Sequence, residues 1–170
     1  MKNSIAIASV VALLSASSAW ADGNNNTSNI DQIGDNLTGV STQTGNGNTS
    51  LSNIDQGLNV PGDNLIATIA QGGINNMHEA HAKQDGSDSI ADITQGGDTT
   101  MNYAFVEQKG TGNDALILQN GTGNDNGVEI YQTGTGALNT ATVMQGGMNN
   151  VNAVGISQTG GGLSANITQN

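Results

Sequence analysis

Glutamine recurs along this chain at nearly constant intervals, and this periodicity constrains the fold more than any other feature. The 170 residues contain twelve glutamines, and the interval between successive ones is always an odd number, eleven at the shortest and fifteen at the longest. Twelve randomly placed residues would not give such spacing. The glutamines are Gln32, Gln43, Gln56, Gln71, Gln84, Gln95, Gln108, Gln119, Gln132, Gln145, Gln158 and Gln169.

The residues around each glutamine repeat as well. Ile or Val stands two residues before ten of the twelve, a small residue or Val stands four before, and Gly follows two after in ten of eleven places. Repetition at every second position is typical of a strand with one specified face, which suits Ile and Val. The pattern predicts twelve strands of about seven residues, each followed by a glycine turn. Asn recurs six residues before glutamine at Asn26, Asn102, Asn113, Asn126, Asn139 and Asn152.

The spacing predicts an all-β fold, a parallel two-sheet β-solenoid built from strand–arc–strand rungs. Two strands form one rung, so the twelve strands give six rungs, and neighbours within one sheet are separated by two glutamine intervals, as Gln84, Gln108 and Gln132 are. Ala and Ile point inward between sheets that pack about 10 Å apart. Stacked Gln and Asn side chains hydrogen-bond along the stack, as in cross-β assemblies. We therefore predict a self-assembly ladder made of all twelve glutamines together with Asn102, Asn113, Asn126, Asn139 and Asn152.

The outward positions give an independent check of this register. Lys83 is expected between Asp55 and Glu107 of the neighbouring rungs, and Lys109 is expected beside Asp85. Opposite charges on adjacent strands stabilise pairing by about 0.2–1 kcal/mol. The even-numbered strands carry a more apolar outer row, which is either a surface for lateral packing of fibres or a set of ordinary surface aliphatic side chains. This row contains Ile66, Ile90, Leu116, Leu118 and Met144.

The N-terminal segment reads as a targeting sequence. Lys2 precedes a mostly apolar run from residue 5 to residue 14, which is too short to span a bilayer. Ala19 and Ala21 then supply the small residues that a signal peptidase recognises. We predict a secretory signal peptide over residues 1–21 and a repeat domain over residues 22–170.

Composition excludes several classes of function. The formal net charge is −11, with three basic residues and no cysteine, which disfavours nucleic-acid binding and thiolate chemistry. No Ser, His and Asp set has a catalytic spacing, so we expect neither an enzyme nor a cofactor. His78 and His81 are expected on opposite faces of one strand, where they cannot share a metal ion. The acidic turns keep one alternative open, a monomeric acidic β-solenoid that binds cations as a β-roll does.

The two ends of such a stack are expected to be adhesive. The sequence shows no polar capping segment of the kind that solenoids normally need. Each terminal rung would therefore present unpaired backbone groups and a matching side-chain ladder, which template a further copy of the chain. A head-to-tail contact of this kind does not close, so it generates a filament. The sequence thus predicts a structural protein that polymerises into fibres of the cross-β type.

One stretch of the repeat resembles a known family. The run Gln108-x-Gly110-x-x-Asn113-x-Ala115-x3-Gln119, led by Asn102, resembles the curlin repeat of bacterial curli subunits. That family's pattern is Ser-x5-Gln-x-Gly-x-x-Asn-x-Ala-x3-Gln, and the resemblance extends over nearly all of residues 22–170. In this chain Asn or Leu often replaces the leading Ser.

The resemblance implies export across the outer membrane and nucleated assembly into amyloid fibres on the bacterial cell surface, where they serve adhesion and the biofilm matrix. It implies as partners other copies of the chain, a nucleator subunit and outer-membrane export machinery, and it favours the major subunit over the minor nucleator. It also implies that the terminal repeats carry the strongest self-association; the alternative is that all glutamines contribute alike. The terminal glutamines are Gln32, Gln43, Gln158 and Gln169.

Overall fold

The computed structural model of the chain describes residues 11–15, 25–57, 62–134 and 136–170, and every regular element in these ranges is a β-strand. No described residue belongs to a helix that is long and apolar enough to cross a membrane. Twelve of the strands end at a glutamine or shortly after one, as the sequence predicts.

These twelve strands form two parallel sheets, which take alternate strands of the chain. Sheet 1 contains β2 (Asn25–Gln32), β5 (Thr49–Gln56), β8 (Met77–Ser87), β10 (Met101–Thr111), β12 (Asp125–Gly134) and β14 (Val151–Thr159). Sheet 2 contains β4 (Thr38–Gln43), β7 (Ile66–Gln71), β9 (Ile90–Gln95), β11 (Asn113–Gln119), β13 (Asn139–Gln145) and β15 (Ser164–Gln169). The predicted β-solenoid of six rungs and twelve strands is confirmed.

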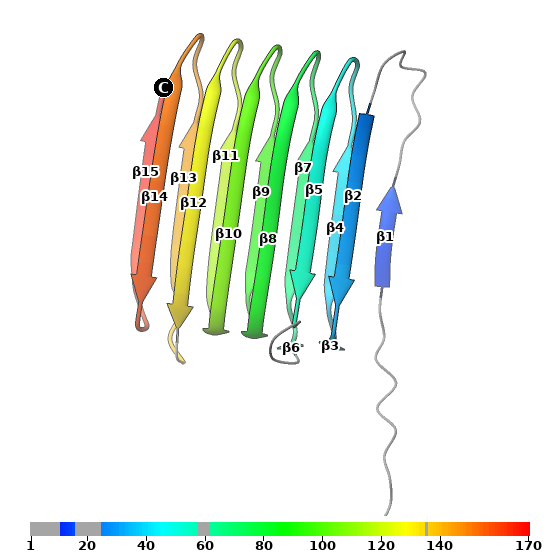
Figure 1. Cartoon of the computed structure of the whole chain (residues 1–170). Coiled ribbons are helices and arrows are strands. Elements are labelled where there is room, and N and C mark those ends of the chain that lie inside the picture. Colours follow the sequence, from blue (N-terminus) through cyan, green and yellow to red (C-terminus); the bar gives the residue numbers. More distant parts are fainter. Residues whose placement is uncertain (1–10, 16–24, 58–61, 135) are drawn as a thin grey trace, which may run out of the picture.

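The rungs follow one another in chain order, from β2 and β4 at one end to β14 and β15 at the other (Figure 1). Glutamine lies opposite glutamine at every step of both sheets, for example Gln84 between Gln56 and Gln108. Rungs of unequal length therefore keep one register, because the extra residues of the longer ones are accommodated in the arcs.

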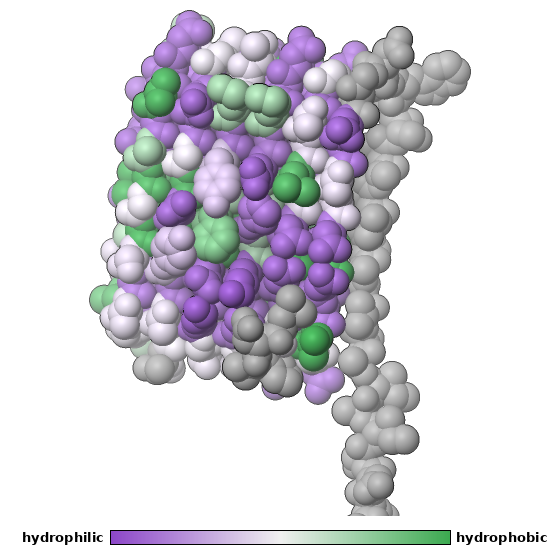
Figure 2. Space-filling view, in the orientation of Figure 1, coloured by the Kyte–Doolittle hydropathy of each residue, from purple (hydrophilic) through white to green (hydrophobic). Residues whose placement is uncertain are grey.

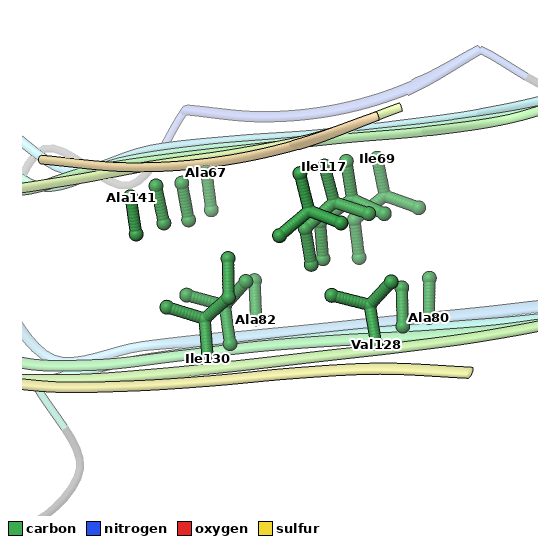
Figure 3. Packing of buried hydrophobic residues seen from close by; sticks show 14 of the residues in the cluster. Ala67, Ile69, Ala80, Ala82, Ile117, Val128, Ile130 and Ala141 are labelled. Carbon is green, nitrogen blue, oxygen red and sulfur yellow. The ribbon is translucent and has the colours of Figure 1, made fainter. Parts of the chain in front are cut away.

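Inward side chains of the two sheets interlock with small residues opposite large ones. Ile117 and Ile69 of sheet 2 face the row that contains Val128 and Ala80 of sheet 1, whereas Ile130 lies opposite the alanine row of sheet 2 (Figure 3). The isoleucines at positions 54, 69, 93, 117 and 130 have no exposed surface. Burial of one such side chain stabilises the fold by roughly 1.5–3 kcal/mol. This interdigitated packing explains how a chain with so few large apolar residues builds a core.

The first rung departs from this packing. Gly39 and Ser41 of β4 stand where later rungs carry Ala and Ile or Val, and Ser41 is hydrogen-bonded to Ser52 across the core at 2.8 Å. A side chain at Gly39 is disfavoured, because an added Cβ would lie 2.8 Å from Cγ2 of Ile30. The first rung therefore buries less apolar surface than any central rung.

The glycines that follow glutamine have a second role that the sequence pattern does not reveal. β8 and β10 continue through the predicted turn glycine and β12 ends at it, so the chain turns later than expected. An added Cβ on Gly110, whose φ is +90°, would lie 1.9 Å from the carbonyl oxygen of Gly134 on the next rung. Glycine is therefore needed there both for its left-handed backbone and for the close approach of successive rungs.

Three further strands lie outside the repeat. β3 (Gly34–Asp35) and β6 (Gly62–Asp63) pair with each other in the arcs. β1 (Val11–Ser15) pairs in parallel with β4 at the N-terminal edge of sheet 2, and it lies within the predicted signal peptide. The predicted cleavage site after Ala21 lies outside the described residues, so cleavage stays a prediction.

Candidate functional site

The glutamines form two continuous hydrogen-bonded ladders inside the solenoid. In sheet 1, Nε2 of Gln84 donates to Oε1 of Gln108 at 2.8 Å, and Gln108 donates to Gln132 at 2.9 Å. The same contact joins each neighbouring pair of glutamines in both sheets. Every donor points toward the next rung in the C-terminal direction, so both ladders have a defined polarity.

Each glutamine from Gln43 to Gln158 also joins one sheet to the other. Nε2 of Gln84 donates to the carbonyl oxygen of Ile66 at 3.0 Å, and Nε2 of Gln95 donates to the carbonyl oxygen of Glu79 at 3.0 Å. Because the side chains of all central glutamines are buried, an unpaired amide at one of them would cost about 1–3 kcal/mol. Glutamine is thus placed to bind the next rung and the opposite sheet with one side chain.

The predicted asparagines form shorter ladders. Asn126 donates from Nδ2 to Oδ1 of Asn102 at 3.1 Å, and Asn152 donates to Asn126 at 3.2 Å. In sheet 2, Asn139 donates to Asn113 at 3.1 Å. The structure therefore brings all seventeen predicted ladder residues together along the stack, and their role in assembly between copies stays a prediction.

A further asparagine ladder, absent from the sequence prediction, fills the arcs that lead into sheet 1. Oδ1 of Asn76 accepts from the backbone N–H of Thr100 at 2.9 Å, while its Nδ2 donates to the carbonyl oxygens of Gly72 and Gly97. The equivalent arc positions are Asn48, Asn76, Thr100, Asn124 and Asn150, and all but the last are buried. Each stands eight residues before a sheet 1 glutamine, so the spacing of the sequence could have revealed this ladder.

The N-terminal end of the stack carries unsatisfied polar atoms. Oε1 of Gln32 and Oγ of Ser28 are buried without a hydrogen-bond partner. At the other end, Gln169 of β15 accepts a hydrogen bond from Gln145 at 2.8 Å. Among the described strands, none lies beyond β2, β14 or β15. The glutamine ladders thus present hydrogen-bond acceptors at the N-terminal end of the stack and hydrogen-bond donors at the C-terminal end.

His78 occupies an inward ladder position, and His81 lies on the outer side of the same strand, as the sequence predicts. Nε2 of His78 lies 3.3 Å from the carbonyl oxygen of Gly72, and its Nδ1 is buried without a partner. Burial lowers the pKa of His78 below its usual value of 6.5, and the contact with Gly72 opposes this only in part. His81 contacts Glu79 at 2.8 Å and packs beside Tyr103 and Phe105.

His78 is therefore expected to make folding stability depend on pH. The unfolded chain binds a proton near pH 6.5 and the folded chain resists it, so stability falls as the pH drops below 6.5. His78→Asn, which places a neutral amide beside Asn102, should reduce the loss of unfolding free energy between about pH 7.5 and about pH 5.5 by no more than about 1.4 kcal/mol, the most that one proton contributes over one pH unit. Urea titration followed by circular dichroism measures this, and His81→Asn is the control. An unchanged pH dependence in His78→Asn would contradict the assignment.

On the outer face of sheet 1, both lysines of the repeat domain contact the carboxylate of Glu107. Lys83 and Lys109 contact Glu107 at 3.1 and 2.9 Å. The hydrogen bond from Lys109 lowers the pKa of Glu107, partial burial opposes this, and Lys83 adds to the lowering. Lys83 lies between Asp55 and Glu107, and Lys109 lies opposite Asp85, so the predicted register is confirmed.

Acidic residues of the turns lie close together in the first rungs. Asp35 pairs in register with Asp63, and Nδ2 of Asn64 donates to Asp88 at 2.9 Å. Within the described ranges, no three His, Cys, Asp or Glu side chains form a group that could hold a metal ion.

Comparison with known proteins gives one family match. Residues 101–134 match the family model of the curlin associated repeat. This segment contains β10, β11 and β12, with Gln108, Gln119 and Gln132 in their ladders. No curated protein and no solved structure matches the chain. The chain therefore carries a match to the curlin associated repeat within a parallel β-solenoid.

Proposed function

We propose that this chain is a structural subunit of a secreted, self-polymerising, curli-like functional amyloid fibre. The observation that carries the proposal is the polarity of the glutamine ladders, which leave acceptors at one end of the stack and donors at the other. Buried polar groups without partners are costly, and a second copy of the chain supplies the missing partners.

The polarity defines how two copies meet. A second copy beyond β14 and β15 places its Gln32 next to Gln158 and its Gln43 next to Gln169. Each contact then continues a ladder in the direction that it has within the chain. The open strand edges pair in the same register, and because the contact is head to tail, growth continues as a filament.

The predicted signal peptide bears on this assembly. β1 covers the N-terminal edge of β4, which is the edge that a second copy needs in sheet 2. Removal of residues 1–21 takes β1 away and opens this edge. Cleavage during export would therefore couple secretion to the ability to polymerise.

The setting of the fibre follows from the curlin-associated repeat. We infer an extracellular fibre on the bacterial cell surface that contributes to adhesion and to the biofilm matrix. The inferred partners are further copies of this chain, a nucleator subunit and outer-membrane export machinery. The strongly acidic composition gives no surface for nucleic acid.

The test is fibre formation by the chain that begins at Asp22. At micromolar concentration it is expected to form fibres that bind amyloid dyes, show a meridional reflection at about 4.7–4.8 Å, and appear sooner when preformed fibres are added. A product that stays monomeric and gains β-structure only with calcium, reversibly on chelation, would instead support the cation-binding solenoid.

A matched pair of variants tests whether growth uses the end of the stack. Ile167→Lys places a charge on the inward side of β15, whereas Thr168→Lys places it on the exposed outer side. Because an inward Ile contributes roughly 1.5–3 kcal/mol when a further rung covers it, Ile167→Lys is expected to slow seeded elongation roughly tenfold or more. Thr168→Lys is expected to elongate like the wild type. Equal rates in a dye-fluorescence assay would show that growth does not use this end.

A further inference from the structure

The outer faces of the two sheets differ sharply in charge. The face of sheet 1 is largely hydrophilic, with apolar side chains in several places (Figure 2). Two of these, Met77 and Met101, lie side by side. It carries most of the acidic residues in the described strands and the Lys83–Glu107–Lys109 group. Sheet 2 carries only two charged residues at the outward positions of its six described repeat strands, Asp92 and Asp114. The other outward residues of these strands are Thr, Ser, Asn, Met or aliphatic residues.

Some apolar residues of sheet 2 lie next to one another on neighbouring rungs, in rows that also contain Thr and Asp. Ile66 lies opposite Ile90 on the next rung, and Leu118 lies opposite Met144. Leu116 stands on the same face two residues before Leu118. These five side chains are between 38% and 43% exposed, so the solenoid itself leaves them only partly covered.

From these observations we propose that sheet 2 is the lateral interface through which two filaments of this chain pack face to face. The inference rests on the proposed fibre. The occupant is a second copy because the chain carries a net charge of −11, and two copies that meet through their sheet 1 faces would oppose many like charges. A cationic partner would be attracted to sheet 1 instead.

The geometry of the stack also favours a second copy. Parallel strands repeat about every 4.8 Å, and another stack of the same rungs has the same spacing, so rows of side chains can interdigitate along the whole length. A filament repeats the contact once per copy. A weak contact between two single chains therefore becomes strong between two filaments.

Asp92 and Asp114 control the interface. They lie on adjacent strands, and the outward residues that β7 and β13 place beside them are uncharged. Burial raises the pKa of both carboxyls, and the charge of Asp114 adds to the effect at Asp92. Protonation therefore begins at a higher pH than for an ordinary aspartate, and lateral packing is expected to tighten as the pH falls from 7.

Because acidification also reduces the charge of the whole chain, the test uses variants of equal net charge at neutral pH. Asp92→Asn with Asp114→Asn neutralises sheet 2, and Asp31→Asn with Asp125→Asn makes the same change in charge on sheet 1. The first pair is expected to increase the number of filaments per bundle, counted by electron microscopy, at least about twofold. The second pair is expected to leave it near the wild-type value. Equal bundling by the two pairs would overturn the proposal.

A second matched pair tests the apolar rows. Leu118→Glu and Leu51→Glu place the same charge at residues that are each 38% exposed, the first on sheet 2 and the second on sheet 1. Leu118→Glu is expected to give single filaments, while Leu51→Glu bundles like the wild type. Dye-monitored elongation is expected to be the same for both, so a failure to form fibres is distinguished from a failure to bundle.

If none of these chains forms fibres, the proposed fibre function fails. The sheet 2 contact is then tested with the soluble protein. Because the contact between two single chains is weak, sedimentation equilibrium at high protein concentration is expected to show partial dimerisation for the wild type and Leu51→Glu and none for Leu118→Glu. The same mass for all three would overturn the sheet 2 interface independently of the fibre.

Discussion

Gly110→Ala is expected to destabilise the solenoid by about 2–4 kcal/mol, although it adds a single methyl group. The new Cβ would lie 1.9 Å from the carbonyl oxygen of Gly134, and the residue would have to keep a φ of +90°. Neither the backbone of β12 nor that of β10 can move away without breaking the parallel hydrogen bonds between them. Urea unfolding followed by circular dichroism measures the loss.

Gly127→Ala is the matched control in the same sheet. A Cβ at Gly127 meets no atom within 4 Å, because this residue faces outward, and its φ is not positive. Its replacement is expected to leave stability unchanged or to raise it by up to about 1 kcal/mol, since alanine restricts the unfolded chain. Similar losses in both variants would show that the rungs are not stacked as closely as the structure has them.

Gln108→Ala is expected to cost roughly 3–5 kcal/mol, because one side chain holds three hydrogen bonds in a buried place. Gln108 accepts from Gln84 and donates to Gln132 and to the carbonyl oxygen of Ile90. Truncation leaves Oε1 of Gln132 without its donor and opens a cavity between the sheets. The loss is measured as the change in unfolding free energy in urea.

Gln169→Ala separates this internal role from a role at the end of the stack. The side chain of Gln169 is half-buried, and among the described residues it accepts only the hydrogen bond from Gln145, so its truncation is expected to cost less than about 1 kcal/mol. Seeded elongation should nevertheless slow, since in the proposed fibre Gln169 donates to the next copy. If Gln108→Ala and Gln169→Ala lost equal stability, the ladder would not be continuous through the core.

The register of the repeat could be predicted from the sequence because side chains alternate across a strand. Identity at every second residue fixed which of Ala, Ile and Gln face inward, and the odd intervals kept successive strands in phase. The pairing of Lys83 with Glu107 followed from the same spacing. Local periodicity was sufficient here because each rung contacts only its neighbours.

The roles of the arc residues were less predictable from the sequence, because contacts between rungs determine which residue types fit there. Asn76 holds carbonyl oxygens of two successive rungs, and Gly110 is required by the carbonyl oxygen of Gly134 on the following rung. The sequence pattern attributed such glycines to turns alone. The positions eight residues before the sheet 1 glutamines were not singled out from the sequence, although the structure buries most of them.

The amino-acid sequence was sufficient to predict the number of repeat strands, their inward faces, their grouping into six rungs and the more apolar outer row of the even-numbered strands, since these depend on a period of two and on the spacing of glutamine. The direction of the ladders and the cross-sheet hydrogen bonds of the central glutamines became apparent only in the folded chain. These features depend on which atoms of distant rungs come within hydrogen-bonding distance, and that is set by the stacking of the whole solenoid.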